Sequence, residues 1–271
     1  RPEQRLDALS VETACVDGTL VPLAEARIPV TDDGLLRGDG VFEVMRLYDG
    51  VPFAREQHLQ RMAHSAQNLR LEIDLAGIGR DIDALLGEVL PGDALLRTLA
   101  TRGGRRITLI EPLPDLPETV ALGYVTYAPV LLLDGVKSLS YGANMLATRL
   151  ARERGFDEAL LVTPEGSVLE LPTASFFWVA DGVLCTPPLS EHVLDSITRR
   201  LVLEVVEASE LTTTPQGLES AQEAFVASSV REVIPVSRIE ERELPVGPVT
   251  ERTARAVRER IASALARERQ S

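Results

Sequence analysis

The sequence of 271 residues contains little lysine, histidine or cysteine. Lysine and arginine together number 28, and Lys137 is the one lysine among them, which leaves 27 arginines. Cys15 and Cys185 lie far apart and the three histidines share no zinc-binding spacing, so no metal site is expected. Two isolated cysteines favour free thiols in a reducing compartment, and we therefore expect a cytoplasmic protein.

Positive charge and long apolar runs are also scarce. The net charge is −13 at pH 7, and the isoelectric point is near 4.8. Such a surface repels nucleic acids and anionic membranes, whereas a small anion can still enter a local basic pocket. No apolar run approaches the ~20 residues needed to cross a bilayer. The 45% of apolar residues can instead fill a substantial core.

Turn signals predict paired strands. The segments VDGTLV, YDGVPF, TPEGSV and VADGVL place Asp-Gly or Pro-x-Gly between apolar residues, which is typical of tight hairpins. We therefore expect mainly antiparallel strands. Several prolines between residues 112 and 135 favour a boundary near residue 125, which divides the chain into residues 1–125 and 126–271.

Helical periodicity appears in four segments. Residues 55–70 carry an apolar stripe, and His58, Arg61 and Ser65 lie on a neighbouring stripe. The other predicted helices are residues 143–155, a helix capped by Asp195 or Ser196, and an amphipathic helix over residues 250–271.

Lys137 stands between the apolar run VLLL and a helix rich in small residues, at the position of a strand end. Arginine stays protonated, whereas lysine becomes a nucleophile once burial or a nearby positive charge lowers its pKa. This position argues against a surface lysine without a role, and it makes a catalytic amine one candidate beside a structural lysine. A Schiff base with pyridoxal phosphate is the usual chemistry of such a lysine. That cofactor requires an acidic partner for its ring nitrogen, apolar walls, and N–H and hydroxyl donors for its phosphate.

Five ordered motifs between roughly residues 16 and 240 include RGDGVFEVMR, HLQRMAHSA, VKSLSYGANML, LELPTASFFW and AFVASSVREVIPV. Together they resemble the class IV aminotransferases, the fold-type IV pyridoxal phosphate enzymes. The resemblance implies an α+β (mixed α/β) fold with a small, substrate-side lobe over residues 1–125. It also implies a larger, cofactor-binding lobe over residues 126–271 with antiparallel-rich sheets, and a homodimer.

The resemblance also implies roles for particular residues. Lys137 would hold the cofactor and move a proton between substrate and cofactor, and Glu170 would pair with the ring nitrogen. The residues implied in binding the phosphate or the ring face are Arg61, Leu194, Ile197, Thr198, Ser228 and Ser229. Two departures stand out: Leu171 and Pro172 replace a glycine and a small polar residue after Glu170, and no arginine precedes Lys137 in a loop.

Substrate choice in this family depends on the small lobe. Val44 follows Glu43, which resembles the D-amino acid aminotransferases, whereas the lyases typically have threonine here and the branched-chain enzymes glycine. The substrate-side candidates are Phe42, Val44, Arg46 and Arg97 on strands, and Arg105 and Arg106 in a loop. A pocket without a firm carboxylate clamp would also tolerate amines.

We therefore predict a transaminase of D-amino acids, with activity towards (R)-primary amines, that uses 2-oxoglutarate or pyruvate as acceptor. The alternatives are a 4-amino-4-deoxychorismate lyase, a branched-chain L-amino acid aminotransferase, and a non-catalytic pyridoxal phosphate carrier.

Overall fold

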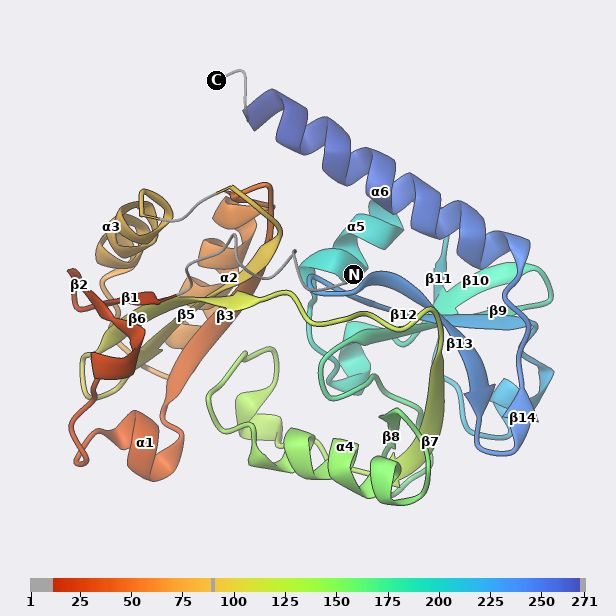
Figure 1. Ribbon diagram of the computed structural model, residues 1–271. Helices are drawn as coiled ribbons and strands as arrows, with labels where there is room; N and C mark the ends of the chain where they lie inside the picture. The colour runs from red at the N-terminus through yellow and green to blue at the C-terminus, as the bar shows by residue number, and fades with distance from the viewer. Residues whose placement is uncertain (1–11, 89–90, 269–271) are drawn as a thin grey trace. The chain divides into compact units, whose positions relative to one another are not determined.

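The computed structural model describes residues 12–88 and 91–268, which form two compact units (Figure 1). The N-terminal unit extends to Pro114 and includes Val136–Ser140. The C-terminal unit contains Asp115–Gly135 and the chain from Tyr141 onward. The predicted division near residue 125 therefore differs from the observed one. Its physical reason is that the strand around residue 125 pairs inside the sheet of the C-terminal unit.

The N-terminal unit is built on a six-stranded antiparallel sheet in the order β2-β1-β6-β5-β3-β4. Its strands are β1 (Thr13–Val16), β2 (Thr19–Pro22), β3 (Gly40–Tyr48), β4 (Val51–Pro52), β5 (Ala94–Thr101) and β6 (Arg106–Pro112). The predicted hairpins join β1 to β2 and β3 to β4. In both turns the Asp-Gly pair has positive φ, as these two-residue turns require.

The described residues of this unit also form the helices α1 (Asp33–Arg37), α2 (Arg55–Asn68) and α3 (Leu75–Leu86), with the short 3-10 helix η1 (Leu23–Glu25). Helix α2 packs on β3, while α3 packs on β1 and β6 (Figure 1). Alternation along β3 turns Val41, Glu43 and Met45 towards these helices. Phe42 and Val44 consequently belong to the opposite face of the sheet.

The C-terminal unit contains an eight-stranded mixed sheet in the order β11-β10-β9-β12-β13-β7-β8, with β14 paired to β13. Its strands are β7 (Val120–Thr126), β8 (Glu158–Val162), β9 (Ser175–Ala180), β10 (Val183–Thr186), β11 (Ser209–Glu210), β12 (Glu223–Ser228), β13 (Glu232–Ile239) and β14 (Arg242–Glu243). Three strand pairs are parallel and four are antiparallel.

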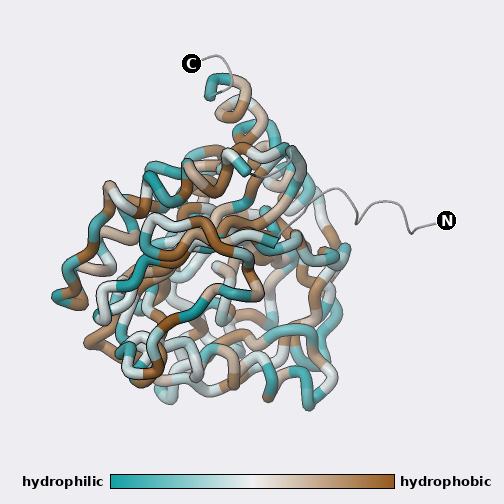
Figure 2. The backbone as a smooth tube through the Cα atoms, turned by 60° about the vertical axis from the view of Figure 1, so that its left-hand side comes forward, coloured by the Kyte–Doolittle hydropathy of each residue, from teal (hydrophilic) through white to brown (hydrophobic). Residues whose placement is uncertain are grey.

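The helices of this unit are α4 (Gly142–Glu153), α5 (Ile197–Val205) and α6 (Pro248–Glu268), with the short 3-10 helices η2 (Leu131–Leu133), η3 (Leu189–Glu191) and η4 (Gly217–Ser220). Helix α4 packs on β7 and β8, and α5 and α6 pack together against β12. Helix α6 alternates hydrophilic and hydrophobic bands (Figure 2), as its sequence predicts. The last residues of that predicted helix, 269–271, lie outside the described residues.

Within residues 12–88 and 91–268, no helix combines the length and the hydropathy that a membrane span needs.

Candidate active site

Lys137 lies in the short segment that belongs to the N-terminal unit. Its carbonyl accepts a hydrogen bond from the backbone of Phe42 (3.2 Å), and its own N–H donates to Ser65 Oγ on α2 (3.1 Å). The neighbouring Ser138 forms a bridge with Val41 at the start of β3. The amine Nζ lies 4.3 Å from the centre of the Phe42 ring. The backbone is therefore fixed on both sides while the amine rests on an aromatic face.

Glu43, His58 and Arg61 form a buried polar cluster between β3 and α2. Nε and Nη2 of Arg61 donate to the two carboxylate oxygens of Glu43, each at 2.7 Å. His58 Nδ1 is also 2.7 Å from Glu43 Oε2. Glu43 is fully buried, and the two basic residues are nearly so. A bidentate pair of this kind orients the guanidinium of Arg61 strongly.

The cluster shifts the pKa values of two of its members. Burial alone would raise the pKa of Glu43, but the hydrogen bonds and charges of Arg61 and His58 lower it to about 2. Burial lowers the pKa of His58, and the positive charges of Arg61 and Lys137 act in the same direction against the attraction of Glu43. At neutral pH, Glu43 is therefore ionised and His58 is neutral, so Nδ1–H donates to the carboxylate.

Two of the candidate substrate residues, Val44 and Arg97, are directly opposite each other in the β3–β5 ladder. The guanidinium carbon of Arg97 lies 5.8 Å from the Phe42 ring centre, so Arg97 and Lys137 flank the same aromatic ring. Arg97 Nε also donates to Glu111 Oε2 at 2.8 Å. The structure thus brings Phe42, Val44, Arg97 and Lys137 together.

Arg46 is on the same strand face as Val44 but farther along β3. It stacks on Tyr48, with its guanidinium carbon 4.6 Å from the ring centre. Its Nη2 lies 3.4 Å from Asp93. Arg46 therefore interacts with Tyr48 and Asp93, four residues farther along β3 than Phe42.

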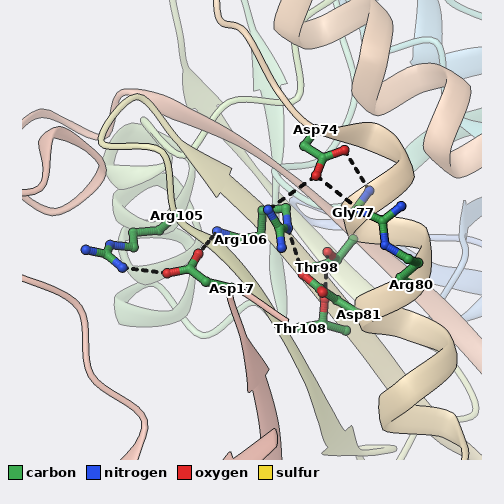
Figure 3. A network of polar contacts seen from close by, with 9 residues as sticks. All are labelled: Asp17, Asp74, Gly77, Arg80, Asp81, Thr98, Arg105, Arg106 and Thr108. Atoms are coloured by element: carbon green, nitrogen blue, oxygen red, sulfur yellow. Dashed lines mark hydrogen bonds and ion pairs between the residues drawn. The ribbon is translucent and has the colours of Figure 1, made fainter. Parts of the chain in front are cut away.

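Arg105 and Arg106, both predicted in a loop, hold parts of the N-terminal unit together (Figure 3), and Arg106 is in fact the first residue of β6. Arg105 Nη1 lies 2.5 Å from Asp17 in the β1–β2 turn. Arg106 Nε donates to the buried Asp81 on α3 at 2.9 Å, and Nη1 lies 3.4 Å from Asp74. Arg106 consequently belongs to the helix-covered face of the sheet, opposite to Phe42. The structure does not bring it together with Lys137.

In the C-terminal unit, Glu170 is tied to the chain that leads into α5. The N–H of Leu194 donates to Glu170 Oε1 at 2.7 Å. Burial raises the pKa of Tyr127, and the negative charge of Glu170 adds to this shift, so the two side chains are neighbours. Two residues after Leu194, Ser196 caps α5 by accepting the N–H of Arg199, as its sequence predicts.

The N-terminus of α5 presents the backbone of Ile197 and Thr198, both of which are buried. The first N–H groups of a helix have no acceptor inside it, and the helix dipole favours an anion there. Ser228 ends β12, and its Oγ accepts the N–H of Arg231 at 3.2 Å. Ser229 follows in the turn between β12 and β13.

These donors fit pyridoxal phosphate in their chemistry. One segment of the C-terminal unit combines a held carboxylate, suited to a protonated ring nitrogen, with a helix N-terminus suited to a phosphate. Within the N-terminal unit, the amine of Lys137 lies on the apolar face of Phe42. Leu194, which donates to Glu170, precedes Ile197 and Thr198 by only three and four residues in the C-terminal unit.

The sequence reasoning assigned no role to Glu43, His58 or Ser65. A usable signal for Glu43 was present, since it occupies an inward position on a strand whose other inward residues are apolar. Such a carboxylate needs a buried basic partner. The neighbouring stripe of α2 contained two basic candidates, but pairing across 18 residues could not be read from helical spacing alone.

Comparison with known proteins places the chain in a family. The model described as amino-transferase class IV matches residues 40–239. A "Putative branched-chain-amino-acid aminotransferase" of Methanocaldococcus jannaschii is 33% identical over 266 residues, which cover 88% of this chain and 92% of the relative. An "Aminodeoxychorismate lyase" of Bacillus subtilis is 29% identical over 83% of this chain and 86% of the relative. A "D-alanine aminotransferase" of Bacillus licheniformis is 28% identical over 93% and 98%.

The solved structure of the branched-chain aminotransferase from Thermoproteus uzoniensis with norvaline is also similar. Its TM-score is 0.85, its identity is 27%, and the match covers 93% of this chain and 95% of that chain. The likeness confirms the fold-type IV architecture expected from the sequence. The protein belongs to the class IV aminotransferases, which are pyridoxal phosphate-dependent enzymes.

Proposed function

We propose that this aminotransferase exchanges an amino group between a D-amino acid and a 2-oxo acid such as 2-oxoglutarate or pyruvate, and that it also accepts (R)-primary amines. The proposal depends mainly on the group formed by Val44, Arg97, Phe42 and Lys137. This face offers an amine, a small apolar side chain and a cation around one ring. Val44 follows Glu43 as it does in the D-amino acid aminotransferases.

Lys137 is the residue that would hold the cofactor and then move the proton at the reacting substrate carbon. When bound, pyridoxal phosphate supplies an aldehyde that captures amino groups and a ring that withdraws electrons. Glu170 would keep a proton on the ring nitrogen, and Leu194 would cover the ring face. Arg61, the N–H groups of Ile197 and Thr198, and the hydroxyls of Ser228 and Ser229 would bind the phosphate.

Arg97 would recognise the carboxylate of an amino acid substrate. Its present partner is Glu111, and both side chains are one-third exposed, so a substrate carboxylate can compete with this pair. An amine without a carboxylate would leave the pair intact and meet an electrically neutral face. Both substrate classes are therefore compatible with the same residues.

A branched-chain L-amino acid aminotransferase is the second candidate, and the 33% identical relative of that name favours it. The lyase activity is favoured by the Bacillus subtilis relative but disfavoured by Val44 where lyases typically have threonine. A non-catalytic carrier would bind the cofactor without converting it.

The visible absorption band of the bound cofactor separates these candidates. The holoenzyme would be mixed with D-alanine, L-leucine and (R)-1-phenylethylamine in turn, and the bleaching rate of the band measured. Fastest bleaching by D-alanine, with slower bleaching by the amine, supports the proposal, whereas faster bleaching by L-leucine replaces it with the branched-chain activity. Pyruvate release from aminodeoxychorismate would indicate the lyase, and no bleaching by any donor would indicate the carrier.

We also propose a homodimer. Leu131 and Leu132 are 67% and 91% exposed, and a second copy would cover such side chains. Light scattering should then give about twice the chain mass of 29.5 kDa, whereas the mass of a single chain would overturn this assignment.

A further inference from the structure

The loop that follows Glu170 is tight and anchored. Leu171 and Ala174 form an isolated bridge, with the N–H of Leu171 donating to the carbonyl of Ala174 at 2.9 Å. Only Pro172 and Thr173 lie between them. Proline restricts φ, so this loop has fewer conformations than a loop with glycine in its place.

Two side chains at the start of helix α4 donate hydrogen bonds to a single carbonyl oxygen of this loop. Tyr141 Oη donates to the Pro172 carbonyl at 2.5 Å, and Asn144 Nδ2 donates to the same oxygen at 3.3 Å. Tyr141 directly precedes α4 and Asn144 is in its first turn. Pro172 itself is buried, so its carbonyl depends on protein donors rather than on bulk water.

Glu170 is fixed on its other side as well. Its carbonyl accepts the N–H of Leu161 on β8 at 3.0 Å, and its carboxylate accepts the N–H of Leu194. The backbone carbonyl of Glu170 is thus tied to β8, and the loop that follows it is tied to the start of α4. The direction of the carboxylate depends on both attachments.

We propose that Asn144 and Tyr141 are positioning residues for Glu170 and act through the carbonyl of Pro172. The inference rests on the proposed role of Glu170 at the ring nitrogen. It assigns to α4 a function beyond packing: helix α4 fixes the acid that partners the cofactor. The residues of this chain of contacts all belong to the C-terminal unit, namely Tyr141, Asn144, Glu170 and Pro172.

The first test uses cofactor-free protein and is independent of turnover. The amide of Leu194 reports on Glu170, because it donates to the carboxylate. In Asn144→Leu and Tyr141→Phe, hydrogen exchange at this amide should become on the order of 10-fold faster. The exposed Arg149→Ala on the same helix is the matched control and should leave it unchanged. Unchanged exchange in both variants would overturn the proposal.

The second test is a double-mutant cycle on the loaded enzyme. Asn144→Leu and Tyr141→Phe should each slow the reaction with the amino donor by on the order of 10- to 100-fold. In a Glu170→Gln background, the same changes should have little further effect, because they act through that carboxylate. Full additivity with Glu170→Gln would show an independent role and reject the positioning role.

The two tests separate this inference from the proposed function. If Glu170→Gln alone leaves the reaction rate unchanged, the role of Glu170 at the ring fails, and the exchange of the Leu194 amide still decides whether the loop is positioned. Tyr141→Phe removes one hydroxyl and keeps the ring, so it provides a readout even where Asn144→Leu folds poorly. Melting temperature serves as the check on folding in every variant.

Discussion

Lys137 has a fixed backbone, so its side chain can be changed with little effect on the segment that carries it. We expect Lys137→Ala to lose at least ~10³-fold in turnover, since no other lysine exists to replace the amine. Weak cofactor binding through the phosphate donors should remain. Borohydride reduction followed by peptide mapping should label position 137 in the wild-type protein. An unlabelled Lys137, or wild-type turnover in the variant, would contradict its role.

Glu43 makes the stability of the protein sensitive to acid. Its pKa is about 2 in the folded protein and about 4.3 in an unfolded chain. The unfolded state therefore binds more protons in this window, and the stabilisation is complete above the unfolded value and is lost as the pH falls towards 2. The contribution is about 3 kcal/mol by this difference.

Urea unfolding measured from pH 6 to pH 3 would test this dependence. In Glu43→Gln, the free energy of unfolding should be lower at pH 6 by about 3 kcal/mol, because Arg61 loses its buried partner, and should fall less steeply with acid. The exposed Glu56→Gln on α2 is the control and should follow the wild type. An equally steep fall in Glu43→Gln would assign the acid sensitivity to other groups.

Arg97 should distinguish amino acid donors, which carry a carboxylate, from amine donors, which do not. Arg97→Gln removes the cation beside Phe42, so KM for D-alanine should rise by roughly 10-fold or more while the value for (R)-1-phenylethylamine changes little. Steady-state kinetics with both donors gives the comparison, and the exposed Arg80→Gln is the control. Equal changes for both donors would remove Arg97 from carboxylate recognition.

At the scale of single residues, helical spacing correctly predicted that His58, Arg61 and Ser65 share a side of α2, and all three are buried. Their partners were not predictable. Glu43 and Lys137 reach this helix from distant parts of the chain, and only the folded sheet brings them there. The same reason explains Arg106, whose partners Asp74 and Asp81 come from a helix with no assignment in the sequence analysis.

Helix α3 contains two glycines in very different surroundings. A Cβ at Gly77 would lie 2.2 Å from Asp74 Oδ2 and 2.9 Å from Arg106 Cζ, whereas at Gly79 the nearest atom is 3.8 Å away. Alanine favours a helix by up to ~1 kcal/mol over glycine. Gly79→Ala should therefore stabilise the protein by about 0.5–1 kcal/mol, while Gly77→Ala should destabilise it by roughly 1–3 kcal/mol.

Thermal and urea unfolding of the two variants form a matched pair, since both make the same change in one helix. Stabilisation by both substitutions would show that Asp74 and Arg106 move away from the added methyl group at position 77 without lowering the free energy of unfolding. Destabilisation by both would mean that α3 tolerates no side chain on either side.

At the scale of helices, strands and turns, the features that a few adjacent residues determine were predictable from the sequence. The Asp-Gly turns of the hairpins and the Ser196 cap of α5 depend on a few adjacent residues, and the structure contains them. Helix α3 lacked a clear signal because Gly77 and Gly79 interrupt its pattern with residues of poor helix propensity. The sequence analysis placed the boundary near residue 125, whereas the N-terminal unit ends at Pro114. Prolines mark a connection between units, but they do not reveal with which sheet β7 pairs.

The whole molecule carries an excess of negative charge, which should keep its copies apart at neutral pH. As the pH falls towards the isoelectric point near 4.8, this repulsion disappears. Light scattering of the holoenzyme should therefore rise to a maximum near that pH and decline again on either side. Circular dichroism at the same pH values would separate association of folded protein from unfolding. Strongest scattering at neutral pH would contradict the charge argument.

Val136–Ser140 belongs to the N-terminal unit, although the residues on either side of it in the chain belong to the C-terminal unit. This matters for chimeras made from two members of the family. A chimera that exchanges the first 114 residues as one block would separate Lys137 from the strand and helix that hold its backbone. The five residues would have to be exchanged with that block, although they come later in the chain. Lys137 thus belongs structurally to the N-terminal unit, although it follows Pro114 in the chain, whereas Glu170 belongs to the C-terminal unit.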